Sequence, residues 1–165
     1  MIDHDRFERA AQAGFAAVEF MFPYAYRPED IAARLAATGL QVVLHNLPAG
    51  DWEAGERGIA CHPDRVAEFR AGVARAIAYA QALGVPQLNC LAGPAPEGAD
   101  PALVHQTLVE NLRFAAAALA GAGLRLLVEP INRYDIPGFY LHRTQQALAL
   151  MDEVGAPNLF LQYDV

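Results

Sequence analysis

Apolar positions follow two different spacings along this chain, and the change between them divides the sequence into helices and strands. Apolar residues three and four apart predict five amphipathic helices, and short apolar runs between them predict five buried strands. The expected helices cover residues 5–13, 28–38, 64–83, 101–120 and 145–154, the first of them capped by Asp3 or Asp5. The expected strands cover residues 17–22, 40–46, 87–92, 124–132 and 159–164.

The ends of these helices are marked by capping residues and by glycine. Asp100 and Thr144 are expected to cap the fourth and fifth helices at their amino ends. Each helix pattern closes on a glycine, and an apolar strand begins soon after it; these glycines are Gly14, Gly39, Gly84, Gly123 and Gly155. Alternating helices and strands predict a parallel sheet, because every helix must return the chain to the same end of the sheet.

Two architectures satisfy this alternation, a doubly wound sheet and a β/α barrel. No glycine-rich phosphate-binding turn follows any strand, since Gly93 and Gly98 lie in GPAPEG, where two prolines interrupt a GxGxxG motif. The dinucleotide-binding form of the doubly wound sheet is therefore disfavoured. A complete barrel has eight strands and about 250 residues. We expect an α/β fold that is an incomplete TIM (β/α)8-type barrel, a single domain over residues 1–165 with five parallel strands and five helices.

The composition disfavours several classes of function. A hydrophobic fraction of 54% supports a globular chain, and its apolar runs are far shorter than the roughly 20 residues that cross a bilayer. A net charge of −7 disfavours nucleic-acid binding, which depends on neutralising phosphates. All 12 basic residues are arginine, so the chain has no lysine for a Schiff base or a Walker-type site. Cys61 and Cys90 are too few for a disulfide framework and favour a reducing, cytoplasmic location.

Three residues able to bind a divalent metal or move a proton stand at the ends of predicted strands. They are His45, Glu129 and Asp164, and the carboxyl ends of parallel strands meet at one edge of the sheet. Two carboxylates converging there would form an oxygen-rich site suited to magnesium or manganese rather than zinc. Glu129 also has a structural alternative, which is an ion pair with Arg125 or Arg133.

Other polar residues indicate packing rather than chemistry. Glu19, inside an apolar strand, is expected to hydrogen-bond a neighbouring strand from a buried position. Residues 47–63 form a glycine-rich loop that is too long for a simple connection, so we expect a lid or rim over a site. Trp52, the only tryptophan, either closes over substrate or fills a small core within this loop. Cys61 and His62 are expected to pack at the rim rather than bind metal.

Six runs of sequence carry a resemblance to one enzyme family. They are VEFMFPY (18–24), LHNLPAGDWEAGERGIAC (44–61), NCLAG (89–93), TLVENLRFAA (107–116), LLVEPINRYDIPGF (126–139) and LQYDV (161–165). They span nearly the whole chain and resemble the hydroxypyruvate isomerases, for which LHNLPAGDW followed by GERGIAC is the most specific signature. This resemblance implies a (β/α)8 barrel that interconverts hydroxypyruvate and tartronate semialdehyde through an enediolate, as part of glyoxylate metabolism.

The resemblance also implies roles for individual residues. Glu129 matches the family glutamate that binds the metal and acts as one of two acid/base carboxylates, and Asp164 matches the metal-binding aspartate of the next strand. His45 falls at the family's pocket histidine, and Asp135 lies where related epimerases place an acidic substrate contact, so both are expected to bind substrate. Asp135 has a structural alternative as a turn residue before Pro137. The implied cofactor is magnesium or manganese.

The resemblance places part of the catalytic machinery outside these 165 residues. The family's remaining metal ligand and second catalytic glutamate come from strands beyond Val165, and its first strand precedes Met1, so we expect metal binding and turnover to be weak or absent. The expected partner is a small keto or hydroxy acid, with no nucleic acid and no membrane. The alternatives are another isomerase or epimerase of the same superfamily, and a non-catalytic chain that associates, as a possible homo-oligomer, through sheet edges at Phe20 and Phe160.

Overall fold

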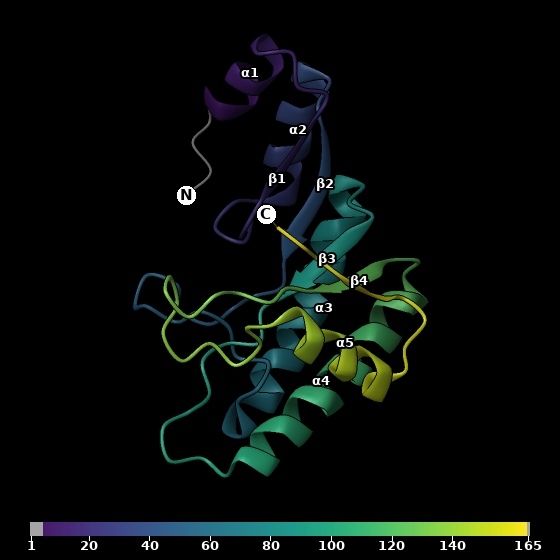
Figure 1. Cartoon of the computed structure of the whole chain (residues 1–165). Coiled ribbons are helices and arrows are strands. Elements are labelled where there is room, and N and C mark those ends of the chain that lie inside the picture. Colours follow the sequence, from purple (N-terminus) through teal and green to yellow (C-terminus); the bar gives the residue numbers. More distant parts are fainter. Residues whose placement is uncertain (1–4, 165) are drawn as a thin grey trace.

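The computed structural model of the chain describes residues 5–164 and alternates helices and strands as the sequence predicts (Figure 1). Asp3, one of the two predicted caps of the first helix, lies outside the described residues. The helices are α1 (Asp5–Gln12), α2 (Pro28–Thr38), α3 (Val66–Leu83), α4 (Pro101–Gly121) and α5 (Thr144–Val154), with a 3₁₀ turn, η1 (Pro63–Arg65), before α3. The strands are β1 (Ala17–Phe20), β2 (Gln41–Asn46), β3 (Gln87–Cys90), β4 (Arg125–Val128) and β5 (Leu159–Leu161).

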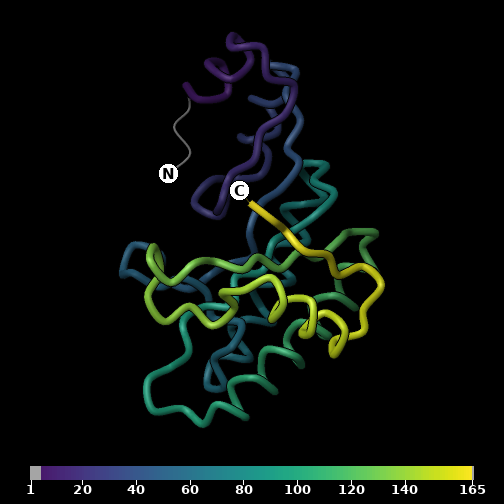
Figure 2. Tube along the Cα trace, in the orientation of Figure 1, coloured from purple at the N-terminus to yellow at the C-terminus, as the bar shows by residue number. Residues whose placement is uncertain are grey.

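The five strands form one parallel sheet in which the order along the sheet is the order along the chain, β1-β2-β3-β4-β5. In a doubly wound sheet the order reverses at a switch point, so the unbroken order confirms the barrel-type sheet. Each helix also contacts the next helix along the chain, from α1 to α5. The helices therefore form one layer that follows the sheet, as in a section of a TIM barrel (Figures 1 and 2).

The hydrophobic core lies between the sheet and this helical layer. On β3 and β4, the side chains of Leu88, Leu126 and Val128 are at most 1% exposed. On the opposite face of the sheet, Leu127 is in register with Asn89 on one side and Phe160 on the other. Within residues 5–164, no helix is long and apolar enough to cross a bilayer.

The two edge strands of the described sheet are β1 and β5, which carry Phe20 and Phe160 as predicted. Phe160 is 43% exposed on its edge. Residues of both edges nevertheless line one cavity, among them Glu19 from β1 and Asp164 from just beyond β5. The sheet is therefore curved, so that its two edges approach across its inner face.

Most of the predicted helix ends are confirmed. The Asp100 carboxylate accepts a hydrogen bond from the Ala102 N–H at 2.9 Å and so caps α4. The glycines that end α2, α3 and α5 adopt the left-handed conformation that glycine tolerates, and they are Gly39, Gly84 and Gly155. Local sequence signals thus set the boundaries of these helices.

The prediction that Thr144 caps α5 is wrong. Thr144 is the first residue of the helix, and Arg143 before it provides no side-chain cap. The Gln146 side chain instead accepts the His142 N–H at 3.1 Å, so a residue within the first turn closes this end.

The strands are also shorter than the apolar runs that predicted them. β1 stops at Phe20 and β4 stops at Val128, because the chain turns out of the sheet shortly before Pro23 and Pro130. Proline has no N–H to continue a strand ladder. The apolar residues past these strand ends belong to loops around the cavity, as Ile131 does.

The loop after β2 is a packed rim. Its residues Leu47 and Ile59 are each 2% exposed, and Gly58 forms an antiparallel bridge with Ala92 in the loop after β3. A Cβ atom on Gly58 would lie 2.6 Å from the Gly93 nitrogen, so the two loops approach this closely only because no side chain separates them. The rim interpretation of this loop is therefore favoured over a free lid.

Gly58→Ala is expected to destabilise the fold by roughly 2–3 kcal/mol, because the added methyl group must displace the backbone of the facing loop. Gly55→Ala is the matched control, since Gly55 also has a positive φ but has open space at its Cβ position, so it should lose only about 1 kcal/mol. Urea unfolding followed through the emission of Trp52 measures both free energies. Equal losses in the two variants would contradict the packing of the loops through Gly58.

Candidate active site

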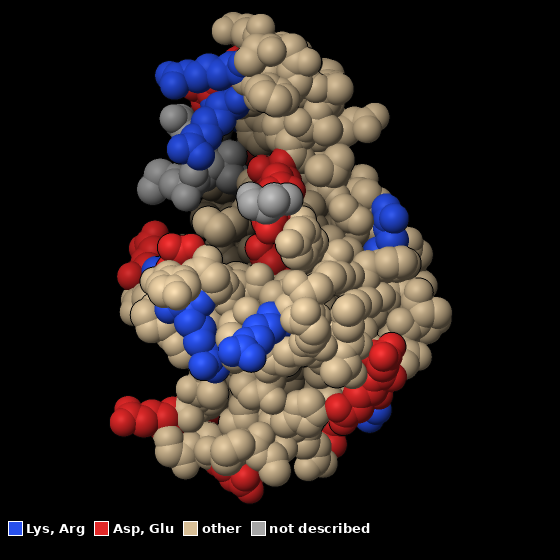
Figure 3. Space-filling view, in the orientation of Figure 1, with Lys and Arg blue, Asp and Glu red and all other residues tan. Residues whose placement is uncertain are grey.

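A cavity of about 400 Å³ lies at the carboxyl ends of the strands. It is lined by Glu19, Phe20, Met21, Leu44, Asn46, Trp52, Leu91, Glu129, Ile131, Ile136, Gln162 and Asp164. Every titratable side chain in this lining is a carboxylate, and the space-filling view shows acidic side chains around a hollow near the middle of the face (Figure 3). The cavity is therefore suited to a positively charged group or to chemistry that moves protons.

Glu129 lies directly after β4 and is half-buried in the cavity wall. The Asn89 side-chain amide, from β3, donates a hydrogen bond to Glu129 Oε2 at 2.8 Å. Burial raises the pKa of Glu129, the Asn89 hydrogen bond opposes this rise, and the carboxylates of Asp164 and Glu19 add to it. Glu129 is therefore a carboxylate whose pKa is shifted toward the range useful in general acid–base catalysis.

The two arginines considered as ion-pair partners of Glu129 lie elsewhere. Arg133 donates its Nε–H to the Phe139 carbonyl oxygen at 3.3 Å. Arg125 lines an adjoining hollow on the inner face of the sheet, which shares Glu19 and Asp164 with the cavity but is not lined by Glu129. Among residues 5–164, neither arginine forms an ion pair with Glu129. The structural alternative for Glu129 is therefore wrong, and a neutral amide holds this carboxylate.

Asp164 reaches the same cavity from the segment after β5. The Gln162 N–H donates to the Val128 carbonyl oxygen at 2.9 Å, which continues the pairing of β4 and β5 past the end of the strand. Asp164 is close enough to Glu129 to raise the pKa of that residue by its charge and by a hydrogen bond. Two facing carboxylates repel each other unless a proton or a cation lies between them.

The carboxylate pair fits magnesium or manganese by the type of its ligand atoms, because both ions prefer oxygen. Glu129 and Asp164 supply two such ligand groups. Within residues 5–164, there is no group of three or more histidine, cysteine, aspartate or glutamate side chains that could hold a metal ion. Among the described residues, Glu129 and Asp164 are therefore the two candidate ligands for such an ion.

Two further polar residues, Glu19 and Asn89, lie near Glu129. Glu19 is exposed on the inner face of β1 and lines the cavity, so the prediction of a buried hydrogen bond to a neighbouring strand is wrong. Asn89 is 1% exposed and contacts Glu129 directly. The sequence signal for the position of Asn89 is the alternation of side chains along a strand. Its neighbours Leu88 and Cys90 are buried on the face toward the helices, so Asn89 points to the other face.

His45 lies beside the cavity but packs toward the helices. Its ring stacks on Phe20 and meets Tyr24 edge to face, with centroid distances of 6.4 and 5.9 Å. Its Nδ1 lies 3.2 Å from the Asn46 carbonyl oxygen, while Nε2 is buried without a hydrogen-bond partner among the described residues. Burial lowers the pKa of His45 to about 4, so the ring is neutral near pH 7. Substrate binding by His45 stays a prediction.

Asp135 lies in an exposed turn after Glu129. The Asn132 side chain organises this turn, because its Oδ1 accepts the N–H groups of Tyr134 and Asp135 at 2.9 and 3.0 Å. The Asn132 amide also donates to the Asp135 carboxylate at 2.7 Å. Ile136, the next residue, lines the cavity. The structure thus gives Asp135 the contacts of a turn residue, and its role in substrate binding stays a prediction.

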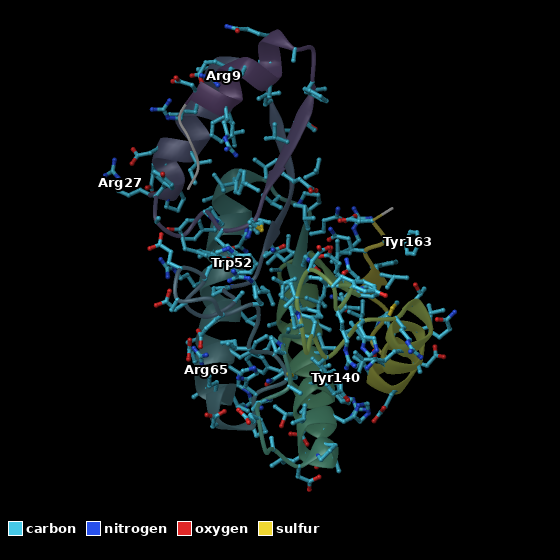
Figure 4. All side chains as sticks on the ribbon, turned by 60° about the vertical axis from the view of Figure 1, so that its left-hand side comes forward. Arg9, Arg27, Trp52, Arg65, Tyr140 and Tyr163 are labelled. Carbon is cyan, nitrogen blue, oxygen red and sulfur yellow. The ribbon has the colours of Figure 1, made fainter. Side chains whose placement is uncertain are left out.

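Trp52 forms part of the cavity wall. Figure 4 shows it in the middle part of the molecule, on the rim loop. Its indole packs against Phe22 at a centroid distance of 5.0 Å, and the Arg57 guanidinium lies 4.2 Å from the ring centroid on the same loop. These contacts fix the ring. Trp52 therefore both lines the cavity and packs within its own loop, so the two interpretations made from the sequence are compatible.

Comparison with known proteins relates this chain to one barrel family. Residues 7–165 match the family described as Xylose isomerase-like TIM barrel. The chain is 59% identical to the hydroxypyruvate isomerase of Escherichia coli strain K12 over 160 residues, which cover 97% of this chain and 62% of that protein. It is 48% identical to the 2-oxo-tetronate isomerase of Cupriavidus necator, again over 97% of this chain and 62% of the relative. The chain thus spans less than two thirds of the length of these relatives.

Solved structures give the same picture of the fold. A crystal structure titled AP endonuclease, family 2, from Brucella melitensis superposes with a TM-score of 0.94 at 42% identity, over 98% of this chain and 62% of that one. A D-allulose 3-epimerase from Methylomonas sp. superposes with a TM-score of 0.76 at 24% identity, over 96% of this chain and 55% of that one. The second likeness bears on the fold alone.

Asn89→Leu is expected to raise the pKa of Glu129 further, because the lost hydrogen bond stabilises the ionised carboxylate. Asn111→Leu is the matched control, since the Asn111 amide is also buried but donates to the Ala60 carbonyl oxygen. Carbon-13 NMR titration of the glutamate carboxyl groups, without added metal, measures the pKa. An unchanged pKa in Asn89→Leu would contradict the role of this hydrogen bond.

The burial of neutral His45 predicts a loss of stability at acidic pH. The pKa of His45 falls from 6.5 to about 4 on folding, so its contribution is fully present above pH 6.5 and is lost as the pH falls toward 4. Within this window the unfolding free energy should decrease by up to about 1.4 kcal/mol per pH unit from this group. His45→Gln should remove that part of the slope in urea unfolding measured at several pH values. An identical slope in the variant would show that His45 does not titrate in this way.

Proposed function

Because the chain belongs to the xylose isomerase-like TIM barrel family, we propose that it forms the Glu129–Asp164 part of an isomerase site for short 2-oxo acids. The observation that carries the proposal is the half-buried Glu129 carboxylate, held by Asn89 beside Asp164 in one cavity. Hydroxypyruvate and 2-oxo-tetronate, the compounds named for two relatives, both have a hydroxyl group on the carbon next to the keto group. The proposed substrate is hydroxypyruvate and the proposed product is tartronate semialdehyde.

Glu129 is the proposed base of this reaction. Hydroxypyruvate becomes tartronate semialdehyde when C3 loses a proton and C2 gains one, and when the proton of the C3 hydroxyl group moves to the C2 oxygen, with an enediolate between substrate and product. Ionised Glu129 takes the C3 proton, and its raised pKa makes it a stronger base than an exposed carboxylate. The Asn89 hydrogen bond orients the carboxylate and favours the ionised form that this step requires. Return of a proton to C2, together with transfer of the hydroxyl proton from the C3 oxygen to the C2 oxygen, completes the isomerisation without any other reactant.

Glu129 and Asp164 are also the residues proposed to hold a divalent metal ion, magnesium or manganese. Such an ion would supply positive charge close to the substrate oxygens. Two protein ligands among residues 5–164 support weak binding of the ion and little turnover. We propose that these strands are part of an eight-stranded barrel whose first and C-terminal strands lie outside this chain, since the chain spans 62% of the relatives' length.

An isomerase is favoured over the other activities of related barrels. A cavity whose titratable groups are all acidic and a net charge of −7 disfavour binding of a nucleic-acid backbone. Identities of 59% and 48% to two isomerases of oxo acids, against 24% to an epimerase structure, support the oxo-acid substrate over a ketose sugar. A cytoplasmic location is proposed with it, supported by Cys61 and Cys90 as buried free thiols.

A coupled assay with hydroxypyruvate and manganese tests this proposal. The chain is expected to show slow turnover, and Glu129→Gln should reduce kcat at least about 100-fold, because the variant has no base at this position. Glu97→Gln is the matched control, since Glu97 is an exposed carboxylate in the loop before α4. A wild-type rate equal to the uncatalysed rate, or equal rates for Glu129→Gln and wild type, would contradict the proposal.

A further inference from the structure

The polar side chain that β2 contributes to the cavity lining is Asn46, whereas the sequence suggests His45. We propose that Asn46, rather than His45, contacts the substrate and contributes to its selection. The inference rests on the proposed function, because it concerns the same cavity and the same class of 2-oxo acid. It adds a substrate-binding residue to those that the sequence predicts.

The alternation of β2 separates these two neighbours. Successive residues of a strand point to opposite faces of the sheet. His45 is in register with Phe20 and Leu88, and its ring packs on Phe20 and Tyr24 under the helical layer. Asn46 is in register with Asn89, whose amide reaches Glu129 on the cavity face. Asn46 therefore shares a face with the catalytic carboxylate, and His45 does not.

The backbone of Asn46 is fixed on both sides. Its N–H donates to the Met21 carbonyl oxygen at 2.8 Å, and its own carbonyl oxygen accepts the Tyr24 hydroxyl at 2.5 Å. His45 Nδ1 lies 3.2 Å from that same carbonyl oxygen. His45 and Tyr24 thus act on the cavity indirectly, by holding the strand end that carries Asn46.

The side chain of Asn46, in contrast to its backbone, has no hydrogen-bond partner among the described residues. Asn46 is 8% exposed and lines the cavity, yet its amide makes no hydrogen bond within residues 5–164. Some polar side-chain atoms are fully buried without a hydrogen-bond partner, such as His45 Nε2 and Asn89 Oδ1. Neither polar atom of the Asn46 side chain is among them. The Asn46 amide is therefore accessible from the cavity and has both its donor and its acceptor available.

The chemistry of the cavity requires such a group. A 2-oxo acid is an anion, and every titratable side chain lining the cavity is a carboxylate, so substrate oxygens that the proposed metal ion does not reach need neutral hydrogen-bond donors. The donor side chains in the lining are Asn46, Trp52 and Gln162, and the Gln162 amide already lies 3.5 Å from Asp164 Oδ2. An amide can donate to a keto or carboxylate oxygen and accept from a hydroxyl group. Asn46 thus matches both functional groups of a hydroxy oxo acid.

Titration of the 165-residue chain with hydroxypyruvate, followed through the indole N–H resonance of Trp52, tests the inference. Trp52 is the only tryptophan and lines the cavity, so one resonance reports on binding. Asn46→Ala should raise the Kd about tenfold, the usual effect of losing one good hydrogen bond. Asn46→Asp should raise it further, because it adds a carboxylate to an acidic cavity. Gln41→Ala, an exposed residue at the other end of β2, is the matched control and should keep the wild-type Kd.

His45→Gln distinguishes the two neighbours in the same titration. If His45→Gln raises the Kd while Asn46→Ala and Asn46→Asp do not, the assignment to Asn46 is overturned. Wild-type Kd values in both Asn46 variants would overturn this inference and leave the proposed function intact. Absence of hydroxypyruvate binding by the wild-type chain would instead contradict the proposed function, and the inference would fall with it.

Discussion

The opposite directions of successive side chains in a parallel sheet are the constraint on which the rest of this structure depends. One face of the sheet must be covered by helices, so Leu88, Leu126 and Val128 form the core. The same alternation then sends Asn89 to the inner face, where it meets Glu129 at the end of the neighbouring strand. The packing of the core and the geometry of the site therefore both follow from the alternation of side chains along the strands.

This constraint also explains the electrostatics of the cavity. Parallel strands end at the same edge, so carboxylates that are far apart in sequence, Glu19, Glu129 and Asp164, line one space. Their proximity and the burial of Glu129 favour its protonated form, and the Asn89 amide counteracts this effect. The pKa of Glu129 therefore depends on the competition between these effects. Rim loops held together at Gly58 and Gly93 form a fixed wall beside this space.

Sequence patterns predicted the fold more completely than the site. The glycines that end helices and the apolar runs gave all five helix–strand units of the described chain, because those signals are local. Glu129 was found for the same reason, as a carboxylate directly after a buried strand. Glu19 was misplaced, because exposure on the inner face depends on how the sheet curves. The face to which His45 and Asn46 point depends on strand register, which one strand alone does not define.

The central claim is that Glu129 removes a proton from the carbon that bears the hydroxyl group of a 2-oxo acid. Proton NMR of hydroxypyruvate in deuterium oxide, with the chain and magnesium, measures this step even when complete isomerisation is slow. We predict that the wild-type chain replaces the C3 hydrogens with deuterium at least about ten times faster than Glu129→Gln does. Equal exchange rates for the two proteins would contradict the account.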